Sequence, residues 1–99
     1  MHRKPAHRPS PLTALGLYVR HLSRKLSVGE DELNPMIDIM PAAPSLLSFT
    51  PPAGGPLAAM LEPDFWTDIN KAVSKELGQE VTTVVEGGVG HVRLTNKVV

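Results

Sequence analysis

The sequence PDFWTDINKAVSKELGQEVTTVVEGGVGHVRLT, residues 63–95, is the most regular part of this 99-residue chain. In its first half, apolar residues recur at the three- and four-residue spacing of one helix face. They are Phe65, Ile69, Ala72, Val73 and Leu77. Pro63 suits the first position of a helix, and Gly78 suits the residue that follows its end. These features predict a helix that begins at Pro63 and ends before Gly78.

The second half of the stretch predicts an antiparallel β-hairpin. The run 81–85 consists of valine and threonine, which favour strands. The dipeptide Gly87-Gly88 suits a two-residue turn, after which residues 89–95 return as a second strand. A lone hairpin is marginal in water. We therefore expect the helix to cover one face and residues 36–40, or a neighbouring copy, to add a third strand.

An amphipathic helix is predicted near the N-terminus. Ser10 and Pro11 suit its N-cap and first helical position, and Gly29 suits its stop. Its apolar residues lie three or four positions apart and share one side: Leu12, Leu15, Val19, Leu22 and Leu26. We place this helix at about 11–27 and assign residues 11–29 to the element.

The rest of the chain carries weaker signals. Residues 1–10 are basic, polar and interrupted by proline, which favours a disordered arm. Residues 30–62 form an acidic, proline-rich connector, with a very short strand expected at 36–40 and an irregular loop at 41–60. The expected fold class is a small single-domain α+β protein, whose connector joins the N-terminal helix to an α–β–β kernel at 63–99.

Composition limits both the core and the chemistry. Apolar residues make up 41% of the chain, but aromatic residues only 4%, so the core is thin and a partner chain could complete it. The absence of cysteine excludes disulfides and thiolate metal sites, and it suits a cytoplasmic location. The longest apolar run, residues 56–61, is far shorter than the ~20 residues of a membrane span. No apolar segment of the kind found in secretory signals follows the basic start.

The charges are segregated along the chain. Residues 1–29 contain no acidic residue, and residues 30–62 contain no basic one. The basic residues of the first segment are Arg3, Lys4, Arg8, Arg20, Arg24 and Lys25. Such an arm and helix could neutralise several phosphates, so a nucleic-acid-binding accessory role is one alternative. Residues 1–29 also have the composition of an organellar transit peptide, so an imported small subunit is a second alternative.

No group of residues has the spacing that catalysis or metal binding requires. The four histidines form no ligand pair, and the position of Asp64 and Asp68 at a helix start explains both carboxylates. No serine lies in a G-x-S-x-G motif. The glycine-rich run 86–91 lies between two strands, whereas a phosphate loop precedes a helix. We therefore expect a non-enzymatic protein without metal or cofactor.

Protein–protein contact is the function that these features favour, because two amphipathic helices and a hairpin with an open edge provide docking surfaces. The candidate partner-binding residues are the apolar side of the N-terminal helix and the tryptophan: Leu12, Leu15, Val19, Leu22, Leu26 and Trp66. Trp66 lies about 100° from Phe65 around a helix, so it either widens the buried face or anchors another protein. Because the chain has so few aromatic residues for its core, we expect Trp66 to be buried there. We expect an adaptor, inhibitor or assembly subunit that binds another protein or copies of itself.

Overall fold

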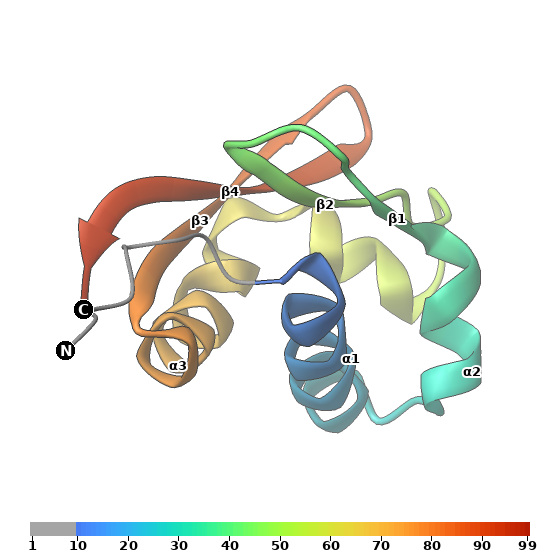
Figure 1. The fold of residues 1–99 in the computed structure, drawn as a ribbon. Helices are drawn as coiled ribbons and strands as arrows, with labels where there is room; N and C mark the ends of the chain where they lie inside the picture. Colours follow the sequence, from blue (N-terminus) through green and yellow to red (C-terminus); the bar gives the residue numbers. More distant parts are fainter. Residues whose placement is uncertain (1–9) are drawn as a thin grey trace, which may run out of the picture.

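The computed structural model of the chain describes residues 10–99, which form a layer of helices and a layer of strands (Figure 1). The helices are α1 (Pro11–Leu26), α2 (Glu30–Leu33) and α3 (Thr67–Leu77). The strands are β1 (Ile37–Ile39), β2 (Ser45–Phe49), β3 (Gln79–Glu86) and β4 (Val89–Val98). Short 3-10 turns occupy Asn34–Met36, Pro56–Leu61 and Pro63–Trp66. Apart from Ser10, the arm predicted at residues 1–10 lies outside the described residues.

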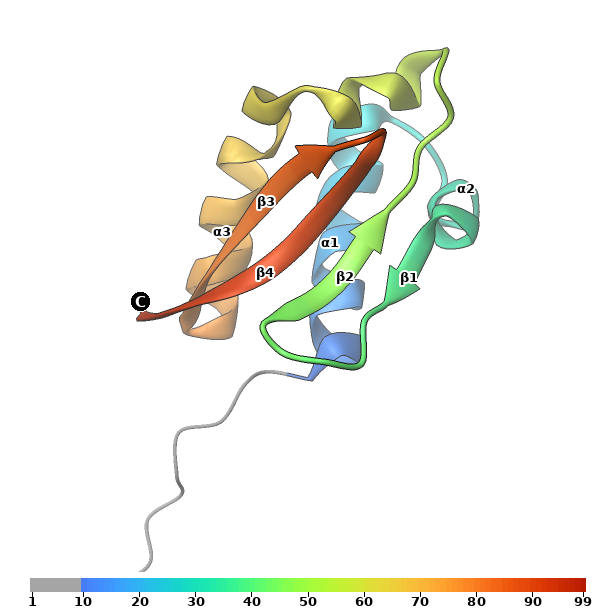
Figure 2. The same cartoon turned by 90° about the horizontal axis from the view of Figure 1, so that it is seen from above.

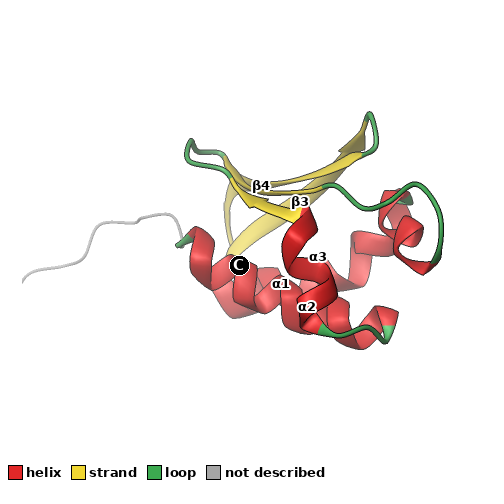
Figure 3. Cartoon of the chain, turned by 90° about the vertical axis from the view of Figure 1, so that its right-hand side faces the viewer, coloured by secondary structure: helices red, strands yellow, loops and turns green. Residues whose placement is uncertain are grey.

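The strands form one antiparallel sheet in the order β1-β2-β4-β3 (Figure 2). Helices α1 and α3 lie against one face of this sheet, and no element within residues 10–99 covers the other face (Figure 3). A helical layer on one side of an antiparallel sheet is an α+β architecture. The predicted fold class is therefore confirmed, and β3 stands at one edge of the sheet.

The N-terminal helix is confirmed, but it ends earlier than Gly29. The Ser10 hydroxyl accepts the backbone N–H of Leu12 at 3.2 Å and caps the start. Ser27 caps the end in the left-handed region, with φ at 55°. The Ser23 hydroxyl donates to the carbonyl of Val28 at 2.6 Å and supports this non-glycine cap.

The second predicted helix is confirmed with a different first turn. Pro63–Trp66 form a 3-10 turn, and the α-helix begins only at Thr67. Gly78 ends this helix in the left-handed conformation, with φ at 79°, as the sequence predicts. The hairpin of β3 and β4 follows directly.

The connector prediction for residues 30–62 is wrong in one respect, because the connector holds two strands of the sheet. The strand expected at 36–40 is β1, but its neighbour is β2 and not the C-terminal hairpin. The strand that joins the hairpin is Ser45–Phe49, inside the stretch expected to be irregular. A register shift between Ser45 and Leu47 lets both Leu46 and Leu47 be fully buried. That shift removes the alternation by which a strand is normally recognised.

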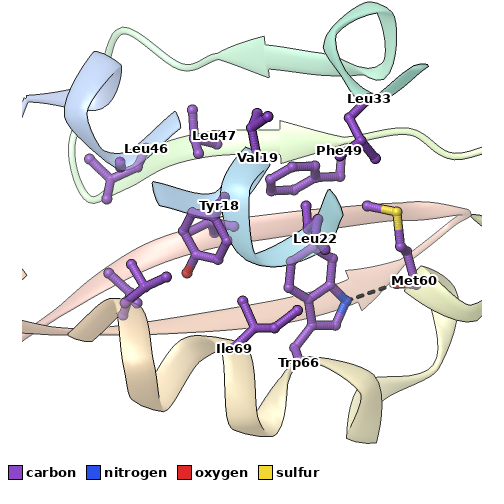
Figure 4. Packing of buried hydrophobic residues seen from close by; sticks show 14 of the residues in the cluster. Tyr18, Val19, Leu22, Leu33, Leu46, Leu47, Phe49, Met60, Trp66 and Ile69 are labelled. Carbon is purple, nitrogen blue, oxygen red and sulfur yellow. Dashed lines mark hydrogen bonds between the residues drawn. The ribbon is translucent and has the colours of Figure 1, made fainter. Parts of the chain in front are cut away.

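Four aromatic rings pack against one another in the core. Figure 4 labels Tyr18, Phe49 and Trp66 among them. The Trp66 ring lies 5.0 Å from Phe49, 6.0 Å from Tyr18 and 5.5 Å from Phe65, measured between centroids. Its Nε1 donates to the buried carbonyl of Met60 at 2.8 Å. Gly90 of β4 lies beside this ring, and a Cβ there would make an ordinary van der Waals contact with the Trp66 side chain at 3.6 Å. Trp66 therefore joins both helices to the sheet.

A part-buried polar network at the margin of the core links α1, α3 and β3. The Tyr18 hydroxyl donates to Asn70 Oδ1 at 2.5 Å, and Asn70 Nδ2 donates to Thr83 Oγ1 at 3.0 Å. Burial raises the pKa of Tyr18 above its ordinary range, so the ring keeps its hydroxyl proton. The network fixes α3 against the edge strand, because Asn70 bonds to Thr83 across the two elements.

Candidate functional site

Most of the predicted partner-binding residues are used by the chain itself. Val19, Leu22 and Trp66 are 5%, 0% and 1% exposed, so the expectation that a partner contacts them is corrected. Leu15 and Leu26 are half-buried against the same core. Leu12 is the exception at 67% exposed. The apolar side of α1 thus closes the core of its own chain, and a single exposed leucine does not make an interface.

The basic side of α1 is engaged by α3 through Glu76. The Glu76 carboxylate lies 3.0 Å from Arg20 Nη2 and 2.8 Å from His21 Nε2. The hydrogen bond from His21, with the positive charges of Arg20 and Arg24, lowers the pKa of Glu76. This pairing reduces the positive potential that α1 presents to a polyanion.

Lys25 is engaged in a different way. Its Nζ donates to the carbonyl of Phe65 at 2.6 Å and lies 4.3 Å from the centroid of the Phe65 ring. Arg24 is exposed. The other three residues of the nucleic-acid alternative, Arg3, Lys4 and Arg8, lie outside the described residues.

The clearest opening for a partner is the free edge of β3. The two-residue turn has positive φ at both Gly87 (59°) and Gly88 (77°), so Glu86 and Val89 close the hairpin as a hydrogen-bonded pair. Backbone groups then alternate along the strand. Those that face β4 belong to Thr82, Val84 and Glu86. Those that face away from the sheet belong to Val81, Thr83 and Val85.

One hydrogen bond from α3 confirms this alternation. The Val81 N–H donates to the Ser74 hydroxyl at 3.0 Å, so it points away from β4. Ser74 is 7% exposed and closes the edge at that residue. The open part of the edge is therefore Thr83–Val85, where the backbone N–H and C=O groups of both end residues point outward. We call this segment the β3 edge.

An open groove runs beside the β3 edge, between α3 and the sheet. Its volume is about 330 Å³. Its lining residues come from one side of α3, from β3 and from the last residue of the chain: Thr67, Asn70, Lys71, Ser74, Glu80, Val81 and Val99. Asn70 lines the groove and also bonds to Thr83, so the groove lies next to the β3 edge. An edge strand beside a helix-lined groove is the geometry in which extended peptides bind by strand addition.

The open face of the sheet brings together polar residues that lie far apart in the sequence. Register places Asp38 opposite Ser48, Ser48 opposite His91, and His91 opposite Val84. Within residues 10–99, no hydrogen bond joins Ser48 to His91, and no group of three or more possible ligands could hold a metal ion. An imidazole without an orienting partner does not activate a serine. This row therefore carries no catalytic assignment.

The sequence indicates that the hairpin has an open edge, but it does not say which of the two strands stands at the edge of the sheet, because that depends on topology. The alternation of inward and outward backbone groups along β3 follows from the turn glycines, which the sequence shows. The position of β3 at the sheet edge follows from the pairing of β2 with β4. In the described part of the chain, no helix is long and apolar enough to cross a membrane. No protein-family model, no curated protein and no solved structure matches this chain.

Proposed function

We propose that this chain is a non-enzymatic protein-interaction module whose docking element is the β3 edge. The observation that carries the proposal is the segment Thr83–Val85, with its outward backbone groups beside the α3 groove. An extended segment placed about 4.8 Å from β3 would form up to four main-chain hydrogen bonds with Thr83 and Val85. Its side chains would alternate between the groove and the open face of the sheet.

The groove supports selectivity for particular side chains. Lys71 offers a positive charge, and Thr67 and Asn70 offer hydrogen-bonding side chains. In strand addition, main-chain bonds supply affinity and such side-chain contacts choose among sequences. An adaptor or assembly subunit needs both properties.

The test is to select peptides of about ten residues from a random display library against the dilute protein. The dissociation constants of the selected peptides are then measured by titration. We expect dissociation constants of about 1–100 µM, because short ladders offset only part of the entropy lost on binding. Val85→Pro removes an outward N–H and should abolish binding. Val85→Ala keeps that N–H and should bind within a few-fold of the original protein.

Two results would contradict the proposal. One is a library that yields no binder. The other is a set of binders whose affinity for the Val85→Pro variant equals that for Val85→Ala, since such peptides would dock elsewhere.

A further inference from the structure

We infer that the segment docked on the β3 edge is the β3 edge of a second copy of this chain, in an antiparallel pair about a two-fold axis at Val84. This inference rests on the proposed function, because it names the occupant of that same edge. It predicts a continuous eight-stranded sheet built from two four-stranded ones. Closed two-fold pairs are the commonest form of self-assembly.

The backbone supports this register. With the axis at Val84, Thr83 of each copy lies opposite Val85 of the other, so every outward group of the two residues meets a complementary group. Gly87 of the second copy falls beside Val81, where Ser74 already closes the edge. A glycine turn leaves α3 the space it needs there, because glycine has no side chain.

Charge disfavours one of the two neighbouring registers. A two-fold axis at Thr83 would place Glu80 of each copy directly opposite Glu86 of the other, twice in the dimer, and like charges opposite each other destabilise a ladder. With the axis at Val84, Glu86 instead lies opposite Thr82 of the second copy. The glutamates thus disfavour the register centred on Thr83.

The side chains of the open face also complement each other across the axis. Val84 is 40% exposed, and the two Val84 side chains would meet in a non-hydrogen-bonded pair, in which Cα atoms lie about 4.5 Å apart. Within one copy, Thr82 lies opposite Arg93. Across the interface, Glu86 of one copy lies opposite Thr82 of the second copy, which lies opposite its own Arg93. Glu86 and that Arg93 are therefore about two strand spacings apart. Glutamate and arginine are long enough to meet above the short threonine, and symmetry makes this ion pair twice.

The interface is small, so the dimer should be weak. A ladder of about five residues a side stays below the ~1,000 Å² expected of a stable complex. Self-association should therefore depend on concentration and appear between about 10 µM and about 1 mM.

Sedimentation or light scattering over that range tests the inference. The original protein should rise from its chain mass of 10.7 kDa towards twice that value. Val84→Lys places two ammonium groups at the axis and should stay monomeric throughout. Glu86→Arg and Arg93→Glu should each weaken the dimer about tenfold, through two lost pairs and two new repulsions. The double variant Glu86→Arg/Arg93→Glu should return to within about twofold of the original.

Circular dichroism and melting of each variant at low concentration check the fold, because all three side chains are exposed. A protein that stays monomeric to about 1 mM overturns the inference. So does a dimer that survives Val84→Lys, or a double variant as weak as the single ones. If the original protein stays monomeric but binds peptides, and Val85→Pro abolishes that binding, the second copy is not the occupant and the proposed function still stands. If the original protein stays monomeric and binds no peptide through this edge, both the second copy and the proposed function are overturned.

Discussion

Replacing Trp66 with alanine is expected to lower the free energy of unfolding by about 3–5 kcal/mol, the cost typical of removing a buried aromatic side chain. The indole is 1% exposed and contacts three other aromatic rings. Its loss would also leave the buried carbonyl of Met60 without its 2.8 Å hydrogen bond. In a domain of this size, total stability is about 5–15 kcal/mol. Urea unfolding followed by circular dichroism measures the change.

Leu12→Ala is the matched control for this prediction. Leu12 is 67% exposed, and its truncation should change stability by less than about 0.5 kcal/mol. Trp66→Phe should fall between the two, because it keeps an aromatic ring but loses the hydrogen bond to Met60. If Trp66→Ala unfolds at the same urea concentration as Leu12→Ala, Trp66 does not lie in the core described above.

Proline at two adjacent valines of β3 is expected to give opposite results. The Val84 N–H faces β4, so Val84→Pro would remove a ladder hydrogen bond and press the proline ring against the neighbouring strand. We expect a loss of at least about 2 kcal/mol, because a sheet carbonyl is left unpaired. The Val85 N–H faces away from the sheet. Val85→Pro should therefore cost much less, and residue 84 is already in the extended conformation that proline requires of its predecessor.

Thermal unfolding of the two variants under the same conditions measures the difference. The Val84→Pro variant should melt at least about 8 °C below Val85→Pro, since 1 kcal/mol corresponds to about 4–8 °C in a domain of this size. Val84→Ala and Val85→Ala control for the lost side chains. Equal melting temperatures for the two proline variants, or the reverse order, would mean that the register of the hairpin is wrong.

Local signals in the sequence were sufficient for α1, α3 and the hairpin. Each of these elements has its own periodicity and its own capping or turn residues. Examples are Ser10 before α1, Gly78 after α3 and the two glycines between β3 and β4. Element ends were less certain, because a cap depends on local contacts. Ser27 ends α1 in place of Gly29 with support from Ser23, and that contact has no sequence signature.

Strand β2 could not be predicted, for a physical reason. It lies between two strands, its leucines Leu46 and Leu47 are both buried by a register shift, and prolines surround it. A short apolar run in proline-rich sequence resembles a loop that touches the core. Its role as a central strand depends on pairing with β4, more than forty residues away.

The candidate site follows from that same pairing. Once β2 occupies one side of β4, β3 becomes an edge, and the outward groups of Thr83 and Val85 become available. Conversely, α1 and Trp66 looked available in the sequence because an apolar stripe does not say which surface covers it. The chain's own sheet covers them.

Amide hydrogen exchange of the original protein tests the open β3 edge most directly. The N–H groups of Thr82, Val84 and Glu86 face β4 and should exchange slowly at every protein concentration. Those of Thr83 and Val85 should exchange rapidly in dilute protein and slow down as the protein is concentrated and the edge is covered. If Thr83 and Val85 are protected in dilute monomeric protein as strongly as Thr82 and Val84, the edge is already closed and the account is wrong.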